Sequence, residues 1–125
     1  MRALTTAQVA ELTAAARAAL PNECCGFLAG TADAVEAILP VVNELASPVA
    51  FRTEARSTLA AFRTMRDRGW DLLAVYHSHP TGDAVPSAAD LRGNTYGPIP
   101  WVIVTPAGEL RTWILNGDTA REVKG

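Results

Sequence analysis

Hydrophobic residues follow two periods along this chain, one typical of helices and the other of strands. Apolar side chains at helical spacing predict a first helix over residues 5–20. The same spacing relates Leu59, Phe62 and Met65, so we expect a second helix over residues 54–68. A third and shorter helix is predicted further on, just before the last strands.

Short apolar runs bounded by turn residues predict the strands of one sheet. The expected strands cover residues 23–29, 34–42, 72–79, 101–105, 110–115 and 118–123, with a further short strand at 51–52. The first two are joined by a turn and should pair antiparallel. This order of elements predicts an α/β protein, in which a mixed α+β sheet is flanked by helices.

Length and composition narrow the class of protein. With 125 residues, of which 49% are hydrophobic, residues 1–125 are expected to form a single domain with one ordinary core. A net charge of −2 gives no electrostatic basis for binding nucleic acid or an anionic membrane. No apolar run approaches the ~18 residues that would suggest a membrane span.

The two cysteines are neighbours, Cys24 and Cys25. Adjacent strand residues face opposite ways, so a disulfide between them would be strained. We interpret them as reduced thiols of a cytoplasmic protein, and the N-terminus shows no signal-peptide pattern.

Candidate chemistry gathers after the strand at residues 72–79, which holds the only two histidines, His77 and His79. Residues two apart on a strand share a face, so both imidazoles can bind one divalent metal ion. Pro80 and the Gly-Asp pair after it turn the chain, and a helix over about residues 87–95 lets Asp90 return as a third ligand. Two histidines, a carboxylate and an open position are typical of catalytic zinc.

A simpler interpretation needs no metal. Ser87 and Asp90 have the spacing of a capping box, in which each would bond the other at the start of a helix. Asp83 could be a further ligand, although a Gly-Asp pair is more typical of a turn.

The combined spacing resembles a known family. Two histidines separated by one residue, then seven residues, Ser87, two residues and Asp90 match the signature of the JAMM (MPN-plus) metalloproteases. That family has a glutamate upstream, and Glu23 stands in the segment E-C-C-G-F-L-A-G. This segment, and N-E-L-A-S-P-V-A-F at residues 43–51, resemble the small bacterial members that process ubiquitin-like sulfur-carrier proteins.

The resemblance implies a fold, a metal and a reaction. The fold would be the JAMM/MPN fold, similar to the cytidine-deaminase-like architecture, and one Zn²⁺ per chain would be held by His77, His79 and Asp90. Glu23 would be the general base and acid, and Ser87 would donate a hydrogen bond to the oxyanion. The substrate would be a ubiquitin-like sulfur-carrier protein, cleaved at the amide bond after its Gly-Gly tail.

Several alternatives stay open at this point. Two histidines and a carboxylate also hold iron in mononuclear oxygenases, usually on a β barrel. Within the superfamily, the chain could be a RadC-like protein linked to DNA repair or a non-catalytic MPN scaffold. The deaminase signature is absent, and an amidohydrolase barrel would need about 250 residues. The identity of the substrate and the oligomeric state do not follow from the sequence.

Overall fold

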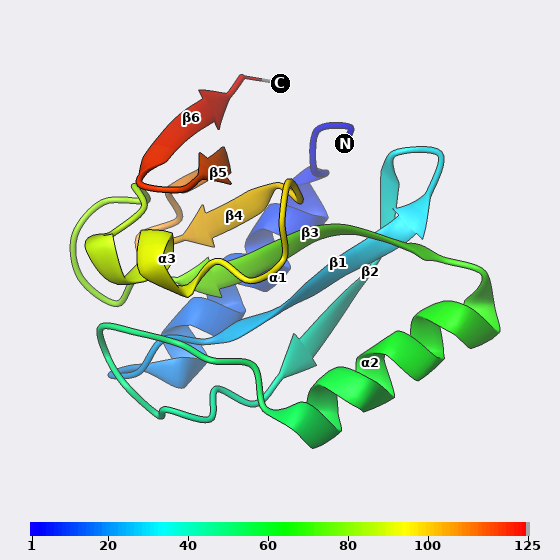
Figure 1. Cartoon of the computed structure of the whole chain (residues 1–125), viewed down its shortest axis with the longest axis horizontal. Coiled ribbons are helices and arrows are strands. Elements are labelled where there is room, and N and C mark those ends of the chain that lie inside the picture. Colours follow the sequence, from blue (N-terminus) through cyan, green and yellow to red (C-terminus); the bar gives the residue numbers. More distant parts are fainter. Residues whose placement is uncertain (125) are drawn as a thin grey trace.

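The computed structural model describes residues 1–124. Within them, six strands form one sheet: β1 (Cys25–Thr31), β2 (Ala34–Val41), β3 (Asp71–Ser78), β4 (Trp101–Val104), β5 (Leu110–Asn116) and β6 (Thr119–Val123). Their order across the sheet is β2-β1-β3-β4-β5-β6 (Figure 1). All neighbours pair antiparallel except β3 and β4, which run parallel. The predicted mixed sheet is confirmed.

The helices of this part of the chain are α1 (Thr6–Ala19), α2 (Ala55–Arg68) and α3 (Ala88–Gly93). α1 starts at a capping box, in which the side chains of Thr5 and Gln8 each accept a hydrogen bond from the other's backbone N–H. α2 ends at Gly69, which takes the left-handed conformation at φ 69°. Among residues 1–124, no helix is long and apolar enough to cross a membrane.

Helices cover both faces of the sheet. Tyr76 of β3 packs in one cluster with Leu12 of α1. Its neighbour Val75 points to the opposite face, where it packs in a cluster with Met65 of α2. Figure 1 shows α1 behind the sheet and α3 in front of it. The strands in the middle are therefore buried on both sides, and residues 25–30 of β1 are buried without exception.

The topology brings two distant segments together at one end of the central strands. β1 runs antiparallel to β3, and Cys25 at the start of β1 pairs with His77 near the end of β3. Glu23, two residues before Cys25, therefore lies at the same end of the sheet as both histidines. The chain leaves β3 at this end and enters α3, which places Asp90 beside the two histidines before the chain continues to the parallel strand β4.

Two strand predictions were wrong. Glu23 is not in a strand, because its backbone pairs with the loop after β2: its N–H donates to the Ser47 carbonyl at 2.9 Å, and its carbonyl accepts from Asn43 Nδ2 at 3.1 Å. The short strand at residues 51–52 does not form either. That segment contains only an isolated bridge between Asn43 and Thr53.

The buried face of α2 also differs from the apolar spacing. Leu59 and Phe62 are 52% and 38% exposed, whereas Ala61 and Met65 are 7% and 4% exposed. Ala61 and Met65 form the face of the helix that packs in one cluster with β1 and β2, and Leu59 and Phe62 lie beside that face. Phe62 still reaches Phe27 of β1, with ring centroids 5.1 Å apart.

Candidate metal centre

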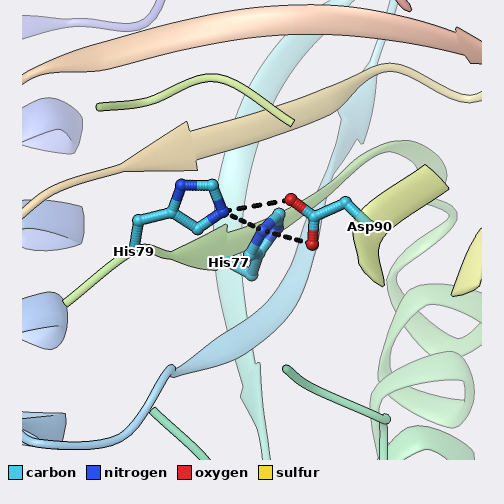
Figure 2. Close-up of side chains that lie close together, drawn as sticks. All are labelled: His77, His79 and Asp90. Atoms are coloured by element: carbon cyan, nitrogen blue, oxygen red, sulfur yellow. Dashed lines mark hydrogen bonds and ion pairs between the residues drawn. The ribbon is translucent and has the colours of Figure 1, made fainter. Parts of the chain in front are cut away.

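Three buried side chains converge where β3 ends (Figure 2). The Nε2 atoms of His77 and His79 lie 3.1 Å apart. Asp90 meets both rings, with Oδ1 3.1 Å from Nε2 of His77 and Oδ2 3.0 Å from Nε2 of His79. Each residue thus offers one ligand atom to a group in which all such atoms lie within 4.8 Å of one another. The structure brings together the three residues that the sequence spacing singled out.

His77 is held by aromatic rings. It is fully buried, stacks on Phe51 with centroids 4.5 Å apart, and meets the edge of Trp101 at 5.5 Å. This contact turns its Nε2 toward the group, while its buried Nδ1 makes no hydrogen bond within the described residues. Aromatic packing and the contact of Nε2 with Asp90 therefore orient this ring, and no described residue holds its Nδ1.

His79 is held by the backbone on both sides of it. It follows the last residue of β3, yet its N–H still donates to the Val104 carbonyl of β4 at 3.0 Å. Its Nδ1 lies 2.8 Å from the carbonyl oxygen of Asp83. A carbonyl only accepts, so Nδ1 carries the proton and Nε2 is the atom that faces the other two residues.

Asp90 is fixed by the start of α3. The Ser87 hydroxyl accepts a hydrogen bond from Asp90 N–H at 3.1 Å, and Ser87 N–H donates to Asp90 Oδ2 at 3.0 Å. This is the capping box that the spacing suggested. It does not compete with metal binding, because the same bonds aim the Asp90 carboxylate at the imidazoles. The hydroxyl hydrogen of Ser87 stays available to donate.

Glu23 contributes a second buried carboxyl group. It is 4% exposed, and its Oε1 has no hydrogen-bond partner among the described residues. Burial raises the pKa of Glu23 to about 7, the negative charge of Asp90 adds to this effect, and His79 opposes it. A carboxyl group whose pKa is near neutral pH can both accept and release a proton there.

The other three groups are shifted by the same surroundings. Burial lowers the pKa of His77. Burial also acts to lower the pKa of His79, but hydrogen bonds to Asp90 and to the Asp83 carbonyl outweigh it and raise that pKa. Burial acts to raise the pKa of Asp90, but hydrogen bonds from both histidines hold it well below its usual range.

This donor set fits a zinc ion. Two imidazole nitrogens and one carboxylate are ligands that catalytic zinc sites use, and they leave one position open. Glu23, whose Oε1 has no partner among the described residues, supplies a buried proton acceptor at the same end of the sheet, where its pKa responds to Asp90 and His79. Asp83 is not in the group, since its side chain is exposed and only its backbone carbonyl reaches His79.

Other residues that the sequence singled out have structural contacts. Ser78 accepts a hydrogen bond from Cys24 N–H at 2.8 Å and so ties the end of β3 to the residue after Glu23. Cys24 and Cys25 are free thiols. Three aromatic side chains expected in the core are buried there: Phe27, Trp101 and Trp113.

The supporting residues were harder to find in the sequence. Asn43 and Phe51 stood in a segment that matched by resemblance alone, and nothing indicated their contacts. Glu109 and Trp113 gave no signal for the site, yet both bond the backbone of the loop after His79. Only the three-dimensional pairing of β4 with β5 brings them there.

Comparison with known proteins identifies the family. A family model described as prokaryotic homologs of the JAB domain matches residues 5–116. A desampylase from Haloferax volcanii is 37% identical over 106 residues, which cover 82% of this chain and 76% of that protein. A CysO-cysteine peptidase from Mycobacterium tuberculosis is 32% identical over 118 residues, covering 89% and 81%. A probable TtuB-protein conjugate cleaving protease from Thermus thermophilus is 35% identical over 96 residues, covering 76% and 63%.

Solved structures agree with this result. The solution structure of a protein from Desulfitobacterium hafniense matches with a TM-score of 0.85 and 35% identity, covering 96% of this chain and 88% of that one. A structure described as a metalloprotease-like zinc site in the proteasome and signalosome, the JAMM site, matches with a TM-score of 0.61 and 18% identity, covering 95% and 89%. The second likeness concerns the fold alone. With a family model matched over most of its length and relatives above 30% identity, the chain belongs to the prokaryotic homologues of the JAB domain.

Proposed function

We propose that this chain is a zinc-dependent peptidase in which His77, His79 and Asp90 hold the metal ion. The observation that carries the proposal is the buried group of two imidazoles and one carboxylate, whose ligand atoms lie within 4.8 Å of one another. A family membership shared with proteins named as peptidases and proteases supports hydrolysis of peptide or isopeptide bonds. It also argues against the iron oxygenase and the non-catalytic scaffold.

Glu23 is proposed as the general base and acid. Zinc in such a site lowers the pKa of a bound water to about 7, which makes a nucleophile available at neutral pH. The Glu23 carboxylate would take the proton from the attacking water and deliver it to the amine that leaves. Its pKa of about 7 and its unpartnered Oε1 suit both steps.

Ser87 is proposed as the oxyanion donor. Its oxygen already accepts a hydrogen bond from Asp90 N–H, which fixes the hydroxyl group beside the metal ligands. The remaining hydroxyl hydrogen can then be given to the carbonyl oxygen of the scissile bond as negative charge develops on it. The helix cap thus holds the catalytic donor in place.

The substrate we propose is a small ubiquitin-like sulfur-carrier protein, cut after its Gly-Gly tail. The names of two relatives, a CysO-cysteine peptidase and a protease that cleaves TtuB-protein conjugates, support a protein substrate that carries an attached group. The match of residues 23–30 to the sulfur-carrier-processing members of the family supports the same class.

A groove beside the metal centre suits such a tail. It has a volume of about 370 Å³ and runs between the loop after β2 and α3. Phe51, which stacks on His77, and Ala89, which precedes Asp90, are part of its wall. A tail that lies extended and close to the backbone at the metal centre would favour residues without side chains, hence glycine next to the scissile bond.

Three further proposals concern the whole protein. Residues 1–125 act as one catalytic domain, because the proposed ligands and the proposed base meet at one end of a single sheet. The protein works in the cytoplasm, where the free thiols Cys24 and Cys25 stay reduced. It acts on a protein partner and binds neither nucleic acid nor a membrane, as its net charge of −2 suggests.

Zinc content and turnover, measured on the same preparations, test the assignment. His77→Ala, His79→Ala and Asp90→Ala should each lose most of the zinc, which is about one ion per chain in the wild type. Glu23→Gln should keep the zinc and lose a factor of about 10²–10⁴ in turnover, because only proton transfer is removed. Glu11→Gln, the same change on an exposed residue of α1, is the control and should match the wild type.

The two parts of the assignment can fail separately. Full zinc occupancy in all three ligand variants would show that the metal is bound elsewhere. An active Glu23→Gln enzyme would show that another group is the base.

A further inference from the structure

The loop that follows His79 is exposed but firmly held at one peptide unit. Its residues Thr81, Gly82 and Asp83 are exposed, whereas the next residue, Ala84, is completely buried. The Asp83 carbonyl and the Ala84 N–H belong to the same planar peptide group. This group joins the candidate metal ligand to the opposite hairpin.

Each end of this peptide unit bonds a different side chain. The carbonyl of Asp83 accepts from Nδ1 of His79 at 2.8 Å. The N–H of Ala84 donates to Oε1 of Glu109 at 2.8 Å. The carboxylate of Glu109 and the imidazole of His79 are therefore connected through a single rigid peptide group. Hydrogen bonds in such a chain polarise and strengthen one another.

A second bond fixes the next carbonyl. The indole Nε1–H of Trp113 donates to the Ala84 carbonyl at 2.9 Å, and Trp113 is only 8% exposed. Both polar groups of Ala84 are thus satisfied by side chains. Neither bond could form if this loop moved away from β5.

The hairpin that supplies these two side chains is itself closed. Glu109 lies in the turn between β4 and β5, where its N–H donates to the Thr105 hydroxyl at 3.1 Å and its carbonyl accepts from Thr105 N–H at 2.9 Å. Trp113 is paired with Trp101 across the two strands. The peptide unit beside His79 is therefore anchored to a rigid part of the sheet.

We propose that Glu109 and Trp113 are positioning residues for His79. By fixing the Asp83–Ala84 peptide, they hold the proton on Nδ1, orient the ring and make Nε2 a better metal ligand. Metal-binding histidines commonly donate their other N–H to a carboxylate or a carbonyl, and loss of that partner weakens the site. Here one peptide group is inserted between the histidine and the carboxylate. The inference rests on the proposed function, in which His79 binds zinc.

Zinc affinity of three variants tests this role. Glu109→Ala removes the acceptor for Ala84 N–H, and its Kd for zinc should rise by roughly 10–100-fold. Glu109→Gln keeps an oxygen at the Oε1 position, so its Kd should lie much nearer the wild-type value. Trp113→Phe keeps a buried ring and removes only one neutral hydrogen bond, for which we expect a rise of roughly twofold to tenfold.

Two further measurements separate positioning from a general loss of stability. Glu36→Ala is the matched control, since Glu36 of the edge strand β2 accepts a hydrogen bond from the Thr31 hydroxyl and lies in a hairpin remote from β4 and β5. It should lower stability without changing the Kd for zinc. In zinc-loaded protein followed by NMR, the Nδ1 proton of His79 should exchange with water faster in Glu109→Ala than in the wild type or in Glu109→Gln.

The inference is overturned if Glu109→Ala binds zinc as tightly as the wild type, or if Glu109→Gln is as weak as Glu109→Ala. His79→Ala in the same titration identifies which idea has failed. Loss of zinc in His79→Ala together with a wild-type Kd in Glu109→Ala would refute the positioning role and leave the metal centre intact. An unchanged Kd in His79→Ala would refute both.

Discussion

Asn43 joins the loop after β2 to the base of the site through four hydrogen bonds of one side chain. Its Nδ2 donates to the carbonyls of Glu23 and Ala50, and its Oδ1 accepts from the N–H groups of Leu45 and Arg52. All four distances are 3.1 Å. Replacement by alanine removes the four bonds at once, so we expect Asn43→Ala to destabilise the protein.

The size of the effect follows from where the partners lie. A hydrogen bond contributes about 0.5–1.5 kcal/mol net, and more is lost when a buried partner is left unpaired. Leu45 and Arg52 are exposed, so water can replace the bonds that their N–H groups lose. The carbonyls of Glu23 and Ala50 are in partly buried contacts, so their loss dominates. The free energy of unfolding should fall by about 2–3 kcal/mol.

Urea unfolding at equilibrium measures this quantity. With a slope of about 1–3 kcal/mol per molar urea, the midpoint for Asn43→Ala should fall by roughly 1–2 M. Asn43→Asp keeps the two accepted bonds and places a second carboxylate oxygen against the two carbonyls, so it should be no more stable than Asn43→Ala. Asn22→Ala is the control, because no side-chain hydrogen bond of Asn22 is found in residues 1–124, and it should change stability by less than about 0.5 kcal/mol. A midpoint for Asn43→Ala equal to that of the control would refute the reasoning.

Three other variants and reactions can be measured in the same preparations. Ser87→Ala should lower kcat by ~10²–10³ with little change in KM, and a loss confined to KM would contradict the oxyanion role. Gly26→Ala should lower the melting temperature and reduce the free energy of unfolding by about 1–3 kcal/mol. The reason is that a Cβ there would lie 2.5 Å from both the Leu39 carbonyl oxygen and the Tyr76 ring. An unchanged melting temperature would show that this contact relaxes freely. Burial, with the charges of its neighbours, raises the pKa of Cys25 to about 12. This thiol should therefore react with iodoacetamide at pH 8 far more slowly in the folded protein than in urea. Equal rates would contradict the burial.

The local parts of the site could be predicted from the sequence. Two histidines on one strand face, and a serine three residues before an aspartate, are relations within a few residues, and strand and helix geometry determine them. The structure brings the side chains of His77, His79 and Asp90 together as that geometry requires. Glu23 was found only through the family resemblance, since its place beside the histidines depends on the antiparallel pairing of β1 with β3.

Long-range contacts could not be predicted in this way. The four bonds of Asn43 and the contact of Glu109 with Ala84 join segments that the apolar pattern leaves unrelated. The same holds for α2, whose existence followed from its pattern but whose buried face did not. Leu59 fits the helical period and is nevertheless 52% exposed, because the position of the helix on the sheet decides which side is covered.

Mass spectrometry of one reaction tests the central claim most directly. The zinc-loaded protein is incubated with a ubiquitin-like carrier protein whose Gly-Gly tail is extended by a few residues, and the products are weighed. We expect a single cut immediately after the second glycine, and a cut roughly tenfold or more slower when that glycine is replaced by alanine. An intact substrate, or a cut at any other bond, would contradict the account.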